Sequence, residues 1–118
     1  MAVAANAPRL AATRLLSHQL EALAIAIGMV LKEYRDYSGA NKQSKKQKDI
    51  VKEARTHQAT VSNLETGKGI PKNPELRRIL KSVGLNPSSK DGSAVLALLG
   101  VIRDNRKRIA KLDTHQPE

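Results

Sequence analysis

The chain has 118 residues with no cysteine, tryptophan or phenylalanine, and its formal net charge is +10. This length suits one domain, and the missing cysteine excludes disulfides and thiolate zinc sites. A core without large aromatic residues has to be aliphatic, which favours helices over sheets. Most of the charge lies between Lys42 and Lys81, where eleven basic residues accompany four acidic ones. Such concentrated charge favours a polyanionic partner, either nucleic acid or an anionic membrane surface, over a basic face that only keeps the protein soluble.

The N-terminal third of the chain predicts one long helix. Residues 1–9 are expected to form a flexible tail, and apolar residues recur with a helical period from Leu10 to Tyr37. A stripe with alternating spacings of four and three runs along this helix: Leu16, Leu20, Leu23, Ile27, Val30 and Tyr34. The stripe is typical of a core face, and the same spacing suits a coiled-coil seam. Gly28 lies inside the run and either allows close packing or marks a bend, at a cost of about 1 kcal/mol relative to alanine.

Three shorter helices are expected in the middle of the chain. The first starts at residue 45 or 46, with Ser44 as its cap, and ends near residue 54. The second starts at residue 56 or 57 and ends at residue 66, and the third follows Asn73 as its cap and ends at Gly84. Together with the long helix, these elements are expected to form one domain over residues 10–86.

A last helix is expected over residues 93–112, followed by a tail over residues 113–118. Its first half carries more large aliphatic side chains than one core face needs, so we expect a homodimer interface there, formed by Val95, Leu98, Leu99 and Ile102. The stripe on the N-terminal helix is the rival dimer surface. The second half, residues 103–111, carries five basic residues, which form a solvated face or add phosphate contacts beside a nucleic-acid site.

Residues 46–66 have the pattern of a helix-turn-helix, in which two short helices are joined by a tight turn. In the second helix, Val61 and Leu64 are three residues apart and are expected to face the core. The opposite face then carries short amide, hydroxyl and methyl side chains: Gln58, Ala59, Ser62 and Asn63. Glutamine and asparagine can each bond adenine in two places in the major groove, so this face predicts a recognition helix. No acidic residue precedes Glu65 there to repel phosphate.

The run from Gln58 to Lys68 resembles the recognition helix and following loop of the phage-repressor/Cro-like (XRE-type) DNA-binding domains, which read Q-x-T-[IV]-S-x-[IL]-E-x-G-K. The resemblance covers residues 23–85. It implies an all-α fold, a five-helix lambda-repressor-like DNA-binding domain, here with an extended N-terminal helix and a C-terminal dimerisation helix. It also implies that Glu65 bonds the N–H groups of the following loop and that Gly67 has a positive φ.

From the residue types and this resemblance we expect two sets of DNA contacts. The side chains expected to face bases are His57, Gln58, Ala59, Ser62 and Asn63. Those expected to contact phosphate are Lys42, Lys45, Lys46, Gln47, Thr60 and Lys68.

The first helix and the turn of the motif depart from the family pattern. The family prefers a small residue at Val51 and a glycine at Arg55, and it prefers leucine and valine where Ala54 and Thr56 stand. An arginine in a left-handed turn costs on the order of 1 kcal/mol. The crossing angle of the two helices is therefore the least determined part of the prediction.

We expect a cytoplasmic, sequence-specific DNA-binding regulator of transcription, a repressor that binds a palindromic operator as a homodimer and regulates its own gene. Two alternatives stay open: an antitoxin that binds both its operator and a toxin protein, and a non-specific nucleic-acid-binding protein. An enzyme is not expected, because no nucleophile lies near a candidate base. No cofactor or metal is expected either, because His18, His57 and His115 lack ligand spacing. The apolar run of residues 22–31 is too short to span a bilayer, so no membrane partner is expected.

Overall fold

The computed structural model describes residues 2–37 and 44–114, and the side chains of residues 11–37 and 44–111. Over these residues the protein is all-helical and has no strand, which confirms the predicted all-α class. The helices are α1 (Ala2–Asp36), α2 (Gln47–Ala54), α3 (Gln58–Glu65), α4 (Asn73–Ser82) and α5 (Lys90–Thr114).

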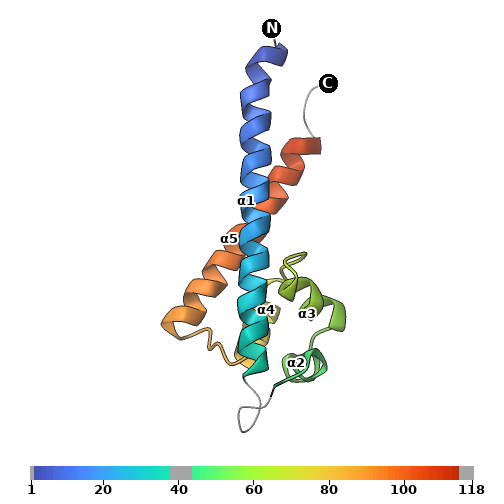
Figure 1. Ribbon diagram of the computed structural model, residues 1–118, viewed down its shortest axis with the longest axis vertical. Coiled ribbons are helices and arrows are strands. Elements are labelled where there is room, and N and C mark those ends of the chain that lie inside the picture. The colour runs from blue at the N-terminus through green and yellow to red at the C-terminus, as the bar shows by residue number, and fades with distance from the viewer. Residues whose placement is uncertain (1, 38–43, 115–118) are drawn as a thin grey trace.

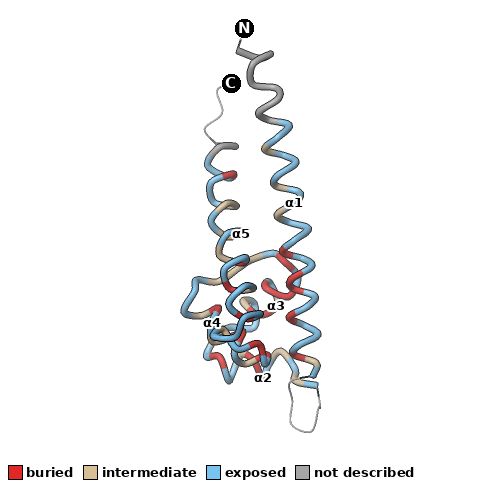
Figure 2. The backbone as a smooth tube through the Cα atoms, turned by 90° about the vertical axis from the view of Figure 1, so that its left-hand side faces the viewer, coloured by how far each residue is buried: buried red, intermediate tan, exposed pale blue. Residues whose placement is uncertain are grey.

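The long helix α1 organises the molecule, which measures 64 × 25 × 20 Å. Helices α2, α3 and α4 gather beside the C-terminal half of α1, and α5 runs from this group along α1 towards its N-terminal half (Figures 1 and 2). At 1.5 Å per residue, the 35 residues of α1 span about 52 Å. The N-terminal half of α1 therefore extends well beyond the group formed by α2, α3 and α4.

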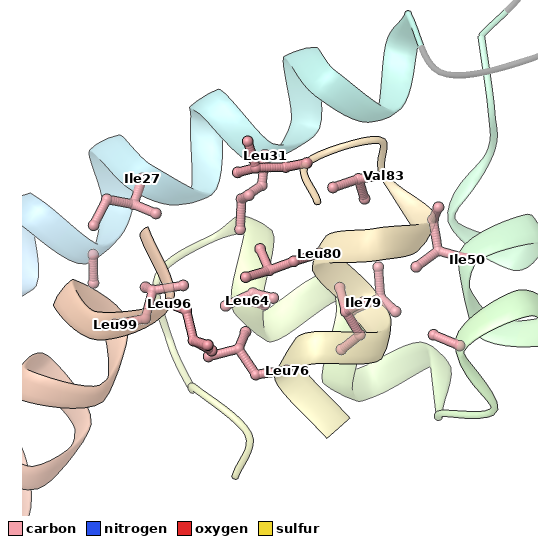
Figure 3. Close-up of a cluster of buried hydrophobic side chains, with 14 of the residues drawn as sticks. Ile27, Leu31, Ile50, Leu64, Leu76, Ile79, Leu80, Val83, Leu96 and Leu99 are labelled. Atoms are coloured by element: carbon pink, nitrogen blue, oxygen red, sulfur yellow. The ribbon is translucent and has the colours of Figure 1, made fainter. Parts of the chain in front are cut away.

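The hydrophobic core lies where all five helices meet (Figure 3). Each helix contributes at least one aliphatic side chain to it, for example Leu31, Ile50, Leu64, Leu80 and Leu99. The first half of α5 closes this core from one side, and α1 closes it from another. The core therefore fixes the angle of α3 relative to both long helices.

The ends of the helices differ from the sequence prediction in several places. Residues 2–9 of the predicted tail belong to α1, since the backbone is helical from Ala2. Four alanines between residues 2 and 7, with the highest helix propensity of any residue, account for the earlier start. The last helix begins at Lys90 and reaches Thr114, and residues 115–118 lie outside the described part of the chain.

The start of α2 is also arranged differently from the prediction. Ser44 does not cap it, because its hydroxyl donates to Oδ1 of Asp36 at 3.1 Å. Instead, the backbone N–H of Lys46 donates to Oδ2 of Asp49 at 2.9 Å, which satisfies one of the free donors at the start of the helix.

The face that α1 turns towards the core matches the predicted stripe only at Ile27, which is buried, and at Leu20, which packs partly against the core. Its buried residues are Ala24, Ile27, Gly28, Leu31 and Arg35. Four residues of the stripe are instead exposed: Leu16, Leu23, Val30 and Tyr34. Residues 22–31 are apolar around the whole helix, so spacing alone did not select the core face. The contact with α3 selects it.

Beside and behind this core face, α1 also carries exposed large apolar side chains, which we call the outer face: Leu15, Leu16, Leu23, Met29, Val30 and Tyr34. Within the described residues one segment, Ala11–Asp36, is long and apolar enough to cross a membrane by length and composition. This segment is longer than the run of residues 22–31 on which the prediction rested. Ile27, Leu31 and the charged Arg35 of this segment are buried against the other helices.

The predicted dimer interface on the last helix is mostly internal. Leu99 and Ile102 are 1 % and 0 % exposed within the core, so assigning them to a dimer interface is wrong. Val95 packs partly against the same core, while Leu98 and Val101 are exposed. The abundance of aliphatic residues in α5 thus reflects a helix that closes the core.

Candidate nucleic-acid interface

Helices α2 and α3 form a helix-turn-helix whose inner side is anchored in the core. Val61 and Leu64 of α3 are buried, as predicted, beside Ile50 and Ala54 of α2. These four side chains set the angle between the two helices. Ala54, at the end of α2, is buried at the position where the resemblance implies leucine.

The turn between α2 and α3 contains a left-handed residue at the position where the resemblance implies one. Arg55 has φ 52° and ψ 55°, as expected for the position where the family prefers glycine. Helix α4 supports this turn from both ends. Nε of Arg78 donates to the carbonyl of Ala54 at 2.8 Å, and the hydroxyl of Thr56 donates to the carboxylate of Glu75. These bonds help offset the cost of arginine in this conformation, on the order of 1 kcal/mol.

Helix α3 is held against α1 through two glycines. A Cβ added to Gly28 would lie 2.3 Å from the carbonyl oxygen of Glu65, so only glycine permits this approach of the two backbones. Gly67 has φ 77°, which confirms the predicted positive φ, and a Cβ there would lie 2.7 Å from the backbone nitrogen of Ile25. The C-terminal end of α3 therefore rests directly on α1.

A buried ion pair joins α1 to α3 at the same contact. Arg35 donates to both carboxylate oxygens of Glu65, from Nε at 2.7 Å and from Nη2 at 3.0 Å, and from Nη1 to the carbonyl of Lys45 at 2.7 Å. The hydrogen bond to Glu65 raises the pKa of Arg35 above its ordinary value, against the opposing effect of burial, so the guanidinium stays charged. Such two-pronged pairs fix orientation as well as charge.

The ion pair continues to the surface through two glutamines. Nε2 of Gln47 donates to Oε1 of Glu65 at 2.9 Å, and Nε2 of Gln58 donates to Oε1 of Gln47. Gln58 is exposed. One N–H of its amide is used by Gln47, and the other N–H together with the amide oxygen remains for adenine, which needs one donor and one acceptor.

The network corrects one prediction and adds one residue. Glu65 is structural, but its partners are Arg35 and Gln47 rather than the loop N–H groups. The loop N–H groups of Lys68 and Gly69 donate to the carbonyl of Asn63 instead. Arg35 was not predicted as part of the site. Its place four residues after Leu31, on what proves to be the core face, was the available signal.

The outward side of α3 carries the residues predicted to face bases. His57, Gln58, Ala59 and Asn63 are exposed, and Ser62 is half-buried. The only carboxylate of α3 belongs to Glu65, which is buried and paired. The exposed side of the helix therefore carries hydrogen-bonding groups without a negative charge.

The residues predicted to contact phosphate have more varied positions. Lys46 and Lys68 are exposed, Gln47 and Thr60 are half-buried, and Lys42 lies outside the described residues. Lys45 does not fit the prediction, because its Nζ is bound to Oε1 of Glu53 and to the carbonyl of Ser82, both at 2.9 Å. Its charge is already balanced by a carboxylate on α2.

The described residues contain no group of three or more histidine, aspartate or glutamate side chains that could hold a metal ion. A comparison of the chain with protein-family models, curated proteins and solved structures finds no match.

Proposed function

We propose that the protein is a sequence-specific DNA-binding regulator that places α3 in the major groove. The observation that carries this proposal is the exposed side of α3, where amides and hydroxyls stand without a carboxylate on a helix anchored to α1 and α2. Base recognition needs such a rigid helix with short polar side chains. The net charge of +10 supplies the attraction to phosphate.

The resemblance of Gln58 to Lys68 to XRE-type recognition helices supports the same function, with a lambda-repressor-like arrangement of the five helices. We propose a cytoplasmic repressor that blocks transcription from its operator and regulates its own gene. The test is selection of duplexes from a random-sequence pool, followed by comparison of the selected duplex with a scrambled one at a single salt concentration. A regulator binds the selected duplex at least about a thousandfold more tightly. Equal affinity for both duplexes would identify a non-specific nucleic-acid-binding protein instead.

Replacing Gln58 or Asn63 by alanine is expected to relax base preference at one position of the operator by about 1–3 kcal/mol. Each amide makes up to two hydrogen bonds to one base, and alanine makes none. Competition binding with all four bases at each operator position measures the effect. Asn105→Ala on α5, whose amide donates to the carbonyl of Val101, is the matched control and should change no preference. A uniform loss of affinity for all duplexes would exclude base reading by the substituted residue.

We further propose that a second copy of the chain covers the outer face of α1. Four of its residues, Leu16, Leu23, Val30 and Tyr34, repeat at intervals of four and seven, which suits a helix paired with its own copy. Monomeric proteins rarely leave so large an apolar surface in water. One helix-turn-helix reads only a few base pairs, so two copies are also needed to read a palindrome.

The double variant Leu23→Glu/Val30→Glu is expected to be a folded monomer that binds the operator at least tenfold more weakly, because charges replace the centre of the paired surface. Mass by light scattering and helicity by circular dichroism measure this. The control is Leu98→Glu/Val101→Glu, which changes the exposed residues of α5 and should stay dimeric. If Leu98→Glu/Val101→Glu is monomeric instead, the dimer interface lies on α5. A monomeric wild type would leave the outer face for another protein, as expected of an antitoxin.

A further inference from the structure

A positively charged groove lies between the recognition helix and α5. It has a volume of about 450 Å³, and its walls come from four parts of the chain: Thr60 and Asn63 of α3, the loop from Gly69 to Lys72, Glu75 of α4, and Arg103 and Lys107 of α5. The basic half of α5 is thus next to residues of α3 that are expected to contact DNA. The sequence had left two interpretations of this half, a solvated face or added phosphate contacts.

Arg103 of α5 lines this groove, Arg106 lies outside its lining, and both donate to uncharged acceptors. Nη1 of Arg103 donates to the carbonyl of Pro71 at 2.8 Å and to Oδ1 of Asn73 at 3.1 Å. Nη2 of Arg106 donates to the carbonyl of Gly67 at 2.8 Å. Carbonyl acceptors hold a guanidinium in place without cancelling its charge. The loop after α3 is therefore bordered by positive charges that are already ordered.

Two acidic residues lie near the groove, and each already interacts with a neighbouring side chain. Glu75 lines it and accepts a hydrogen bond from Thr56 in the turn of the motif. Asp104 lies 3.4 Å from Nε of Arg103, with its side chain 63 % exposed, so water screens this pair strongly. Lys72 and Lys107 add two exposed ammonium groups to the same walls. The net charge of the side chains that line the groove is therefore positive.

The position of the groove relative to α3 matches the position of phosphate beside a helix in DNA. A helix with its side chains is about 10–12 Å wide and the major groove is about 12 Å wide, so phosphates border the helix on both flanks. Gln58 and Thr60 are two residues apart on a helix with 3.6 residues per turn, and they therefore lie on opposite flanks of α3. Gln58 bonds Gln47 of α2 on one flank, and Thr60 lines the groove with α5 on the other.

We propose that this groove binds the DNA backbone on the second flank of the recognition helix, with Lys107 as the principal phosphate contact and Lys72 and Arg103 beside it. Helix α5 then has two functions, since its apolar half closes the core and its basic half widens the footprint on DNA. This proposal rests on the proposed function, because it assumes that α3 lies in the major groove.

The test measures the salt dependence of binding of the full-length protein to the selected duplex. Lys107→Ala is expected to lower the slope of log K against log salt by about 0.9 and to weaken binding about eightfold at 0.1 M salt, the effect of one lost phosphate contact. Lys107→Arg should retain the wild-type slope. Lys90→Ala is the matched control, because it removes the same charge from an exposed position in the first turn of the same helix. It should change neither quantity.

The outcomes separate this proposal from the function on which it rests. If Lys107→Ala and Lys90→Ala lower the slope equally, or neither does, the groove does not bind phosphate, while Asn63→Ala still tests base recognition. If the wild type does not distinguish the selected duplex from the scrambled one, both proposals fail. The unfolding temperature of Lys107→Ala is measured as a control for folding. If it equals that of the wild type, a loss of affinity does not come from a loss of folded protein.

Discussion

Replacing Arg35 by methionine is expected to destabilise the protein by about 3–5 kcal/mol, a large part of the stability of a small domain. The reason is that the buried carboxyl group of Glu65 then has only Gln47 as a donor among the bonds described above. Urea unfolding followed by circular dichroism measures the loss. Arg77→Met, at an exposed position of α4, is the matched control and should change stability by less than about 0.5 kcal/mol.

A second substitution separates the ion pair from the volume of the side chain. The double variant Arg35→Met/Glu65→Met removes both charges, and it should recover most of the stability lost in Arg35→Met, since apolar residues often replace a buried pair without a net cost. If the losses of stability in Arg35→Met and in Glu65→Met simply add up to the loss in the double variant, Arg35 and Glu65 are not coupled. The recovered protein should still bind DNA more weakly, because Gln47 loses the carboxylate that orients it.

The second large effect is expected at Gly28, where alanine should destabilise the protein by about 1–3 kcal/mol. In an ordinary helix the same substitution stabilises by up to about 1 kcal/mol, so the sign is reversed. The cause is that the new methyl would lie 2.3 Å from the carbonyl oxygen of Glu65 and 2.7 Å from that of Leu64, and backbone atoms cannot turn aside as a flexible side chain does. Urea unfolding measures the change.

Gly100 provides the control for this reversal. It also lies inside a long helix, but an alanine methyl there would have its nearest neighbour, Nη2 of Arg103, at 3.7 Å, which is ordinary contact. Gly100→Ala should therefore stabilise by about 0.5–1 kcal/mol. A Gly28→Ala protein that gains stability like Gly100→Ala would mean that α1 and α3 do not touch there. Because α3 has to move in Gly28→Ala, operator affinity should fall in that variant alone.

The sequence predicted the helix-turn-helix well because its determinants are local. Val61 and Leu64 face inward as their spacing predicted, and Arg55 and Gly67 have the positive φ that the resemblance implied for their positions. The all-helical class followed from an aliphatic composition. Local periodicity and turn chemistry require no knowledge of distant neighbours.

The long helices were predicted less well because their roles depend on distant contacts. In α1, the apolar circumference of residues 22–31 was compatible with several faces, and the contact at Gly28 selects one. In α5, Leu99 and Ile102 have the same aliphatic character in a core and in a dimer. The partner of Arg35 is thirty residues away along the chain, beyond the reach of any spacing rule.

The continuity of α1 has a consequence for the layout of the operator. Its C-terminal half is rigidly joined to α3, and its outer face is the proposed pairing surface, so the register in which two copies align sets the distance between their recognition helices. A slip of one heptad, seven residues at 1.5 Å each, would shift one α3 relative to the other by about 10 Å. That is about three base pairs at 3.4 Å each. If the two proposals hold, the pairing register of α1 sets the length of the spacer between half-sites.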